Sequence, residues 1–223
     1  MRVSLLATLF VAAALAQEPG AVSASRKQIT DVPGLPRVLM IGDSISGGYD
    51  EPVRKLLVGK ANVHHGDMGG PTTNGVTHLD KIPAGPWDVI TFNYGLHDMK
   101  LDTGSHQVEI PRYEANLKMI ADALRKTGAK LIWVTTTPVP TGKLNPKRER
   151  GDAPLYNAAA ERALNGKVDA VCDLYSAVLP RESELQLKQN VHFTPPGYDF
   201  LAKQVAASID EFLKSAVPAG VHP

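Results

Sequence analysis

Short apolar runs alternate with helical patterns along most of this chain. Runs typical of buried strands occur at 38–41, 62–65, 88–92, 130–136 and 168–174. Apolar residues at helical spacing occur between and after these runs, at 51–60, 111–127, 153–165 and 195–216. Alternation of this kind produces right-handed βαβ units. The sequence therefore predicts an α/β domain with one parallel sheet covered by helices on both faces.

The N-terminal residues have the pattern of a secretory signal. A positive start is followed by an almost wholly apolar run to residue 14, and Ala-Leu-Ala at 14–16 fits a signal-peptidase site. The run is too short to span a membrane. We expect the following segments: a signal peptide over 1–16, a leader over 17–35, one domain over 36–216 and a tail over 217–223. The expected location is periplasmic or secreted, with no membrane contact after cleavage behind Ala16.

The composition bears on partners and on cysteine chemistry. The 24 Lys and Arg residues nearly balance 23 Asp and Glu residues, and the formal net charge is +1. Nothing in this balance favours nucleic-acid binding. Cys172 is the only cysteine of the 223 residues, which excludes an internal disulfide. Its apolar neighbours predict a small buried core residue and not a nucleophile.

Three polar segments follow predicted strands and contain glycine. They are Gly42-Asp43-Ser44, the glycine-rich stretch 66–75, and the stretch 93–98. Ligands of open parallel sheets bind beyond the carboxyl ends of the strands, so these segments are expected at one functional rim. A structural alternative exists for the first segment, because Asp and Ser also cap helices well.

Four short blocks, in order, resemble those of the SGNH/GDSL hydrolases. The blocks are Gly42-Asp43-Ser44, Gly69-Gly70-Pro71-Thr72-Thr73, Gly95-Leu96-His97-Asp98 and Val191-His192-Phe193-Thr194. The resemblance covers nearly the whole mature chain. It implies a flavodoxin-like three-layer α/β/α sandwich with five parallel strands, and ester hydrolysis of the acetylesterase kind without a cofactor.

The resemblance also implies roles for individual residues. Ser44 is the expected nucleophile and His192 the base that takes its proton. The expected oxyanion donors are the N–H groups of Ser44 and Gly70 and the side chain of His97. Substrate-binding roles are expected for four residues that flank or belong to the blocks: Asp43, Asn93, Tyr94 and Asp98.

Two positions depart from the family pattern. His97 stands where the family has Asn; an imidazole can also donate a hydrogen bond, or it can be structural and bond Asp98 or a backbone carbonyl. Gln189 stands where the family has the Asp that orients the catalytic histidine. Gln189 can orient His192 through its amide oxygen but supplies no charge. The carboxylates that could substitute for it are Glu184, Asp173 and Asp98.

Other candidate sites carry weaker signals. His64, His65, Asp67 and His97 match no defined metal motif, and a strand places adjacent His64 and His65 on opposite faces, so no metal is expected. The glycine-rich stretch lacks the endings of nucleotide-binding loops. The basic residues between 143 and 150 are expected to be solvated, with contact to an anionic substrate as the alternative.

The function expected from these features is serine ester hydrolysis of a short acyl group, preferably acetyl on a carbohydrate, through an acyl-enzyme. The alternative is a carbohydrate-binding protein or weakly active pseudoenzyme on the same fold, because Gln189 replaces the usual Asp. Acyl transfer between sugars would use the same residues. The expected partner is a small-molecule or polysaccharide ester.

Overall fold

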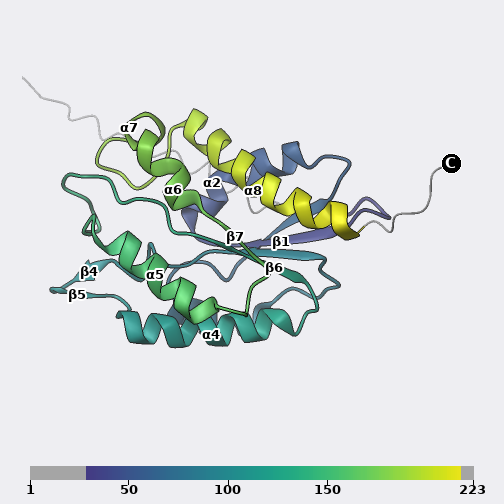
Figure 1. Cartoon of the computed structure of the whole chain (residues 1–223), viewed down its shortest axis with the longest axis horizontal. Helices are drawn as coiled ribbons and strands as arrows, with labels where there is room; N and C mark the ends of the chain where they lie inside the picture. The colour runs from purple at the N-terminus through teal and green to yellow at the C-terminus, as the bar shows by residue number, and fades with distance from the viewer. Residues whose placement is uncertain (1–28, 217–223) are drawn as a thin grey trace, which may run out of the picture.

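The computed structural model describes residues 29–216, with side chains described through residue 214 (Figure 1). The expected signal peptide, the first part of the leader and the C-terminal tail lie outside the described residues. No helix within 29–216 combines the length and apolar character that crossing a membrane requires.

Five parallel strands form the central sheet. They are β1 (Arg37–Ile41), β2 (Asn62–Gly66), β3 (Val89–Phe92), β6 (Lys130–Val134) and β7 (Ala170–Cys172). Their order across the sheet is β2-β1-β3-β6-β7, which is the flavodoxin-like order of a doubly wound sheet. The direction of winding reverses between β1 and β3. A ligand site is therefore expected beyond the carboxyl ends of these two strands.

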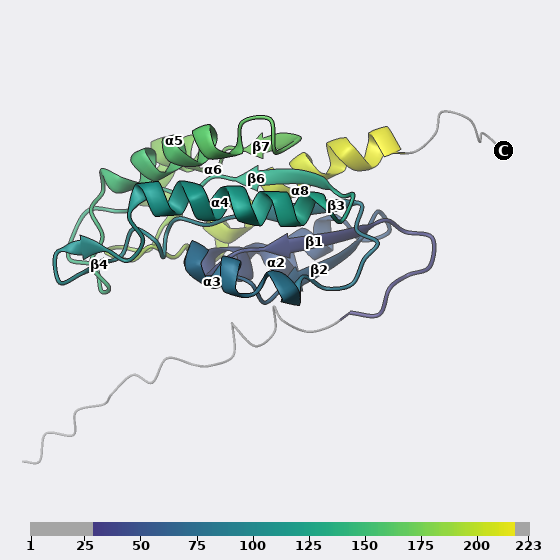
Figure 2. The ribbon, with the colours of Figure 1, turned by 90° about the horizontal axis from the view of Figure 1, so that it is seen from below.

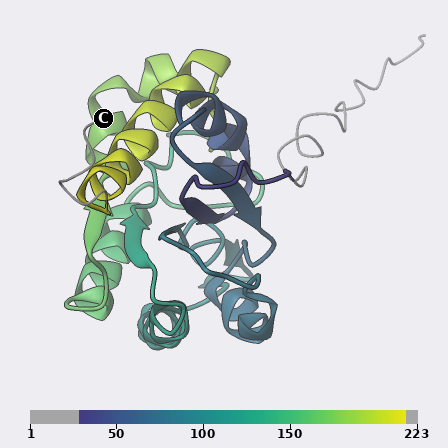
Figure 3. The same cartoon turned by 90° about the vertical axis from the view of Figure 1, so that its right-hand side faces the viewer.

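Helices cover both faces of this sheet. One face carries α2 (Ser44–Leu56) and α8 (Pro195–Ala216), which pack on each other. The other face carries α3 (Thr72–Thr77), α4 (Ile110–Arg125) and α5 (Asp152–Leu164), as Figure 2 shows. Figure 3 shows the strands between the two helical layers. The predicted three-layer α/β/α sandwich is confirmed.

Burial explains why the strands are continuous apolar runs. Val38 to Ile41 of β1 and all of β3 are buried, because helices exclude water from both faces. At the edge of the sheet, β7 is shorter than predicted and its Val171 is 54% exposed. Cys172 of β7 is buried, as expected, and burial raises the pKa of its thiol to about 11.

The first helix begins earlier than the sequence pattern indicates. It was expected at 51–60, but α2 starts at Ser44, and Asp43 caps it by accepting a hydrogen bond from the Ile45 N–H at 2.8 Å. The sequence pattern did not predict this start, because Gly47 and Gly48 follow it and glycine is a poor helix former. The segment therefore caps a helix through Asp43 and places Ser44 at the carboxyl end of β1.

The sequence pattern did not give bounds for the small elements between the main ones. They are a hairpin of β4 (Leu101–Asp102) and β5 (Ser105–His106), the short helices α6 (Leu174–Val178) and α7 (Glu182–Leu185), and the 3-10 turns Leu79–Lys81 and Leu179–Arg181. The end of the leader is also ordered. Asp31 pairs with Arg37 at 2.8 Å and with His64 at 2.7 Å. The packed unit therefore begins before residue 36.

Candidate active site

Ser44 and His192 meet at the carboxyl end of β1. Ser44 is the first residue of α2 and is exposed, while His192 lies in the loop before α8. The Ser44 Oγ lies 2.9 Å from the His192 Nε2, although the residues are 148 positions apart in the sequence. This distance is short enough for direct proton transfer from the hydroxyl to the ring.

Asn190 orients the His192 ring. The Asn190 Oδ1 lies 2.8 Å from the His192 Nδ1 and also accepts a hydrogen bond from the His192 backbone N–H at 3.0 Å. An amide oxygen can only accept, so Nδ1 carries the proton. The Nε2 of the neutral ring is then free to accept the Ser44 proton.

The expectation that Gln189 orients His192 was wrong. Gln189 adopts a left-handed backbone conformation, with φ of 51°, and its side chain packs against Gly142. This turn directs Asn190, the next residue, toward the imidazole. The sequence signal was an Asn two residues before His192, since Asn side chains often bond the backbone two residues on.

The three carboxylates considered as substitutes have other partners. Glu184 pairs with Arg181 at 2.6 Å, and Asp173 accepts hydrogen bonds from Thr135 and from the start of α6. Asp98 accepts from the Thr72 N–H and hydroxyl. Within residues 29–214, none of the three forms a hydrogen bond with His192.

The environment of His192 favours its neutral form. Burial lowers the pKa of the ring, the Arg148 guanidinium lowers it further, and the Asp43 carboxylate opposes both effects. A base with a lowered pKa is already deprotonated at neutral pH, so it can accept a proton there.

Ser44, Gly70, His97 and His192 line one cavity of about 450 Å³. Glycines at the end of β1, in the first part of α2, and at and after the end of β2 form much of the lining. Tyr198 of α8 closes another side, because it packs directly on Gly48 of α2. The predicted nucleophile, base and oxyanion donors therefore face one volume.

The loop that carries Gly70 touches the end of β1 through its backbone. A Cβ on Gly69 would lie 1.9 Å from the Gly42 carbonyl oxygen, and Gly70 has a φ of +107° that favours glycine. The Asn74 side chain holds this loop by donating to the Gly69 carbonyl at 2.6 Å. Gly69 and Asn74 are thus structural parts of the site, although no individual role was expected for either from the sequence.

His97 lies in the turn after β3 and has a partner that was not expected. The Lys100 Nζ lies 2.9 Å from the His97 Nδ1, in place of Asp98 or a backbone carbonyl. The His97 Nε2 lies 4.0 Å from the Asp43 Oδ2. Burial lowers the pKa of His97, Asp43 opposes this, and Lys100, Arg148 and His192 lower it further.

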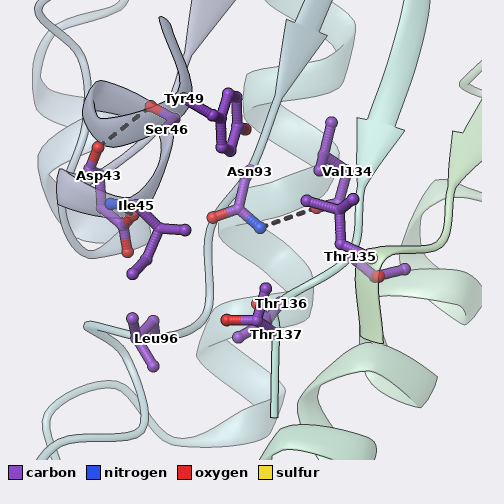
Figure 4. A pocket seen from close by; sticks show the side chains of 11 residues that line it. Asp43, Ile45, Ser46, Tyr49, Asn93, Leu96, Val134, Thr135, Thr136 and Thr137 are labelled. Atoms are coloured by element: carbon purple, nitrogen blue, oxygen red, sulfur yellow. Dashed lines mark hydrogen bonds between the residues drawn. The ribbon is translucent and has the colours of Figure 1, made fainter. Parts of the chain in front are cut away.

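Three of the four expected substrate-binding residues instead hold the rim together. Asn93 donates to the Val134 carbonyl at 2.7 Å, as Figure 4 shows. The Tyr94 hydroxyl donates to the Met68 carbonyl at 2.8 Å, and Asp98 is fully buried against Thr72. The side chains of these three residues turn inward and anchor loops, and none of the three lines the cavity that contains Ser44 and His192. Asp43 does line the cavity.

The basic segment has partners within the protein. Arg148 is buried and donates to the Leu96 carbonyl at 2.7 Å. Lys147 pairs with Glu149 at 2.9 Å and Arg150 with Glu182 at 2.7 Å. Three of the four basic residues in this segment thus have partners within the protein, so their positions need no anionic substrate to explain them.

The histidines of β2 point to different partners. His64 bonds Asp31 and contacts the Trp87 ring edge-on, whereas the His65 Nε2 lies 3.0 Å from the Ser46 Oγ. Within the described part of the chain, no three His, Cys, Asp or Glu side chains are grouped in a way that could hold a metal ion.

Solved structures with the same fold include several esterases. An acetyl xylan esterase, AlAXEase, matches with a TM-score of 0.63 at 18% identity, over 78% of this chain and 99% of that chain. The lipase/acylhydrolase from Enterococcus faecalis matches with a TM-score of 0.66 at 18% identity, over 84% and 100%. A carbohydrate esterase family 3 structure from Talaromyces cellulolyticus matches with a TM-score of 0.63 at 14% identity, over 82% and 100%.

Sequence comparison defines the family. No curated protein shows significant similarity to the chain. The GDSL-like Lipase/Acylhydrolase family, however, matches residues 40–200, a span that includes all four blocks and the Ser44–His192 contact. The chain therefore belongs to the GDSL-like lipase/acylhydrolase family.

Proposed function

We propose that this protein is a carboxylic ester hydrolase in which Ser44 is the nucleophile and His192 the general base. The observation that supports this most directly is the 2.9 Å contact between the Ser44 Oγ and the His192 Nε2. Exposure of Ser44 at the rim and the lowered pKa of His192 also fit the role.

In the proposed mechanism, His192 takes the hydroxyl proton as the Ser44 Oγ attacks the ester carbon. The negative oxygen that forms is stabilised by the N–H groups of Ser44 and Gly70 and by His97. The imidazolium then gives its proton to the leaving alcohol, and an acyl-Ser44 remains. A water molecule, deprotonated by His192, attacks this acyl group; the bond to the Ser44 Oγ then breaks, the imidazolium returns its proton to this oxygen, and the acid is released. Asn190 keeps the ring oriented throughout.

For the substrate, we propose a short acyl group, preferably acetyl, on a carbohydrate. The support is the modest cavity of about 450 Å³ and the acetyl xylan and carbohydrate esterases among the proteins of similar fold. The test is a comparison of p-nitrophenyl acetate, butyrate and octanoate, followed by acetylated xylo-oligosaccharides. A higher kcat/KM for octanoate than for acetate would contradict the short-acyl proposal.

The nucleophile has a direct test. Ser44→Ala is expected to lose at least about 10³-fold in kcat, because removing a catalytic-triad serine typically costs much more than removing an oxyanion donor. A fluorophosphonate probe is expected to label Ser44, and His192→Ala to abolish labelling. Full ester hydrolysis by folded Ser44→Ala protein would refute the mechanism.

The alternative is a carbohydrate-binding protein with weak or no hydrolysis. One observation favours it: Asn190 provides His192 with no negative charge. In that case the probe would not label Ser44, while acetylated or free xylo-oligosaccharides would still bind in calorimetry.

We also propose export, on the basis of the N-terminal sequence alone. N-terminal sequencing of the protein purified from its native host is expected to begin at Gln17. A mature protein that retains Met1 or Arg2 would contradict this proposal.

A further inference from the structure

His97 and Lys100 form a pair that the family pattern does not contain, and it lies at the cavity. We propose that Lys100 is a positioning residue, which holds His97 in the neutral tautomer whose Nε2–H faces the reacting oxygen. The inference rests on the proposed function for its catalytic meaning, but its structural part can be tested in the resting protein.

The contact between the two side chains determines which ring nitrogen carries the proton. The Lys100 Nζ lies 2.9 Å from the His97 Nδ1. An ammonium group has only donors, so the nitrogen that faces it must be an unprotonated acceptor. The proton of the neutral ring is then on Nε2.

The Nε2 side of the ring faces the cavity wall that carries Asp43. His97 lines the cavity together with Ser44 and Gly70. The Asp43 Oδ2 is 4.0 Å from the His97 Nε2, which is too far for a hydrogen bond. The negative charge of this carboxylate still favours an N–H group on Nε2. Within residues 29–214 this N–H has no hydrogen-bond acceptor, so it can serve the oxyanion.

A histidine at this position needs such a partner, whereas an asparagine does not. An asparagine amide always has N–H donors, but a neutral imidazole donates from Nε2 in only one of its two tautomers. With Lys100 in place, the Nδ1–H tautomer and the imidazolium would both direct an N–H toward an ammonium group. Both forms are therefore disfavoured by the contact itself.

The charged and titratable groups around His97 shift its pKa in opposite directions. Asp43, at the start of α2, favours the imidazolium, while Lys100, Arg148 and His192 disfavour it. Arg148 also fixes the turn, because its Nε donates to the Leu96 carbonyl. Removal of Lys100 would leave Asp43 with less opposition, so the pKa of His97 would rise. The lost ammonium would also allow the Nδ1–H tautomer.

The structural test is an NMR measurement on the full-length protein without substrate. Long-range ¹H–¹⁵N correlation spectra distinguish the two neutral tautomers of His97, and a pH titration gives its pKa. The wild type is expected to show the Nε2–H tautomer. Lys100→Met is expected to show a tautomer mixture and a raised pKa, and Lys100→Arg to resemble the wild type. The proposal would be overturned if the wild type showed the Nδ1–H tautomer of His97. It would also be overturned if the tautomer and the pKa of His97 were the same in Lys100→Met as in the wild type.

The functional test is a double-mutant cycle with His97→Asn. Lys100→Met is expected to lower kcat about 10-fold with KM nearly unchanged, which is less than the roughly 10²–10³-fold cost of losing an oxyanion donor. In the His97→Asn background the same change is expected to alter kcat less than about twofold, because the amide needs no tautomer control. Equal losses in both backgrounds would mean that Lys100 acts without His97.

Two further comparisons separate the possible causes of an effect. Lys118→Met removes one exposed lysine from α4, far from any role described above, and is expected to leave kcat unchanged. If Ser44→Ala retains full hydrolysis, the proposed function fails, but the NMR result still decides whether Lys100 controls the His97 tautomer. If hydrolysis depends on Ser44 and the NMR result is negative, only the role of Lys100 fails.

Discussion

Asn190 is the residue whose chemistry most affects the proposed mechanism. Its amide oxygen holds the His192 Nδ1–H at 2.8 Å and so selects the tautomer that can accept the Ser44 proton. A carboxylate would do the same and would also stabilise the imidazolium that forms during the reaction. The neutral amide therefore gives the base its orientation without raising its basicity.

Asn190→Asp tests this point. The added negative charge should raise the pKa of His192, because an opposite charge in contact favours the protonated ring. The activity of a base is lost as pH falls through its pKa. The acid limb of the kcat/KM profile, which depends on the lowered pKa of His192 in the wild type, should therefore move to higher pH.

Gln189→Asp is the matched control for that experiment. It adds the same charge one residue away, at a side chain that packs against Gly142 and not against the imidazole. The acid limb should move less than in Asn190→Asp. A larger shift in Gln189→Asp would mean that the turn rearranges and that residue 189 is the true partner of His192.

Among the elements, the loop between β2 and α3 depends most on close backbone contact. Gly69 lies against the Gly42 carbonyl at the end of β1. The Asn74 side chain from α3 donates a hydrogen bond to the Gly69 carbonyl. The next residue, Gly70, lines the cavity. The geometry of the proposed oxyanion donors is thus set by contact between a loop and a strand end.

Gly69→Ala should therefore reduce both activity and stability. The new Cβ would lie 1.9 Å from the Gly42 oxygen, so the loop must move and take Gly70 with it. We expect at least about a 10-fold loss of kcat, since oxyanion donors are sensitive to position. Urea unfolding should show a loss of about 1–3 kcal/mol in the free energy of unfolding.

Gly151→Ala is the control for the loop prediction. Nothing lies within 4 Å of a Cβ built at this position, and its φ is −71°. Activity should be unchanged, and the free energy of unfolding should change by less than about 1 kcal/mol. If Gly69→Ala behaved in the same way, the loop would not be held by the contact described above.

For the whole molecule, the doubly wound sheet explains both where the core lies and where the site lies. Strand β3 is central and covered on both faces, whereas β7 is at an edge. The reversal between β1 and β3 brings the end of β1, with Ser44, next to the turn that carries His97. Stability should therefore be concentrated in the central strands, and catalysis at their carboxyl ends.

Two alanine substitutions compare the centre of the sheet with its edge. Ile90→Ala in β3 empties a fully buried position and should cost about 2–5 kcal/mol in the free energy of unfolding. Val171→Ala in β7, where the residue is 54% exposed, should cost less than about 1 kcal/mol. Chemical denaturation measures both. Similar losses would mean that the edge is covered in solution.

The sequence by itself determined the sheet, the main helices and the two residues that meet at its rim. Strands covered on both faces must be apolar throughout, so the runs that became β1, β3 and β6 were visible without coordinates. The helix α8 was predicted with its observed bounds because its apolar spacing continues over the whole segment. Ser44 and His192 were found because they belong to short ordered blocks.

Only the tertiary structure decided which side chains face the cavity. The left-handed turn at Gln189 gives Asn190 the contact with His192, and no periodic pattern predicts a single loop conformation. Asn93, Tyr94 and Asp98 follow strand β3 in the sequence, which predicts a place at the rim. Their side chains turn inward in the structure, because buried loop backbone needs hydrogen-bond partners. Partners of this kind lie far apart in the chain, so they become neighbours only when the sheet and its helices are packed together.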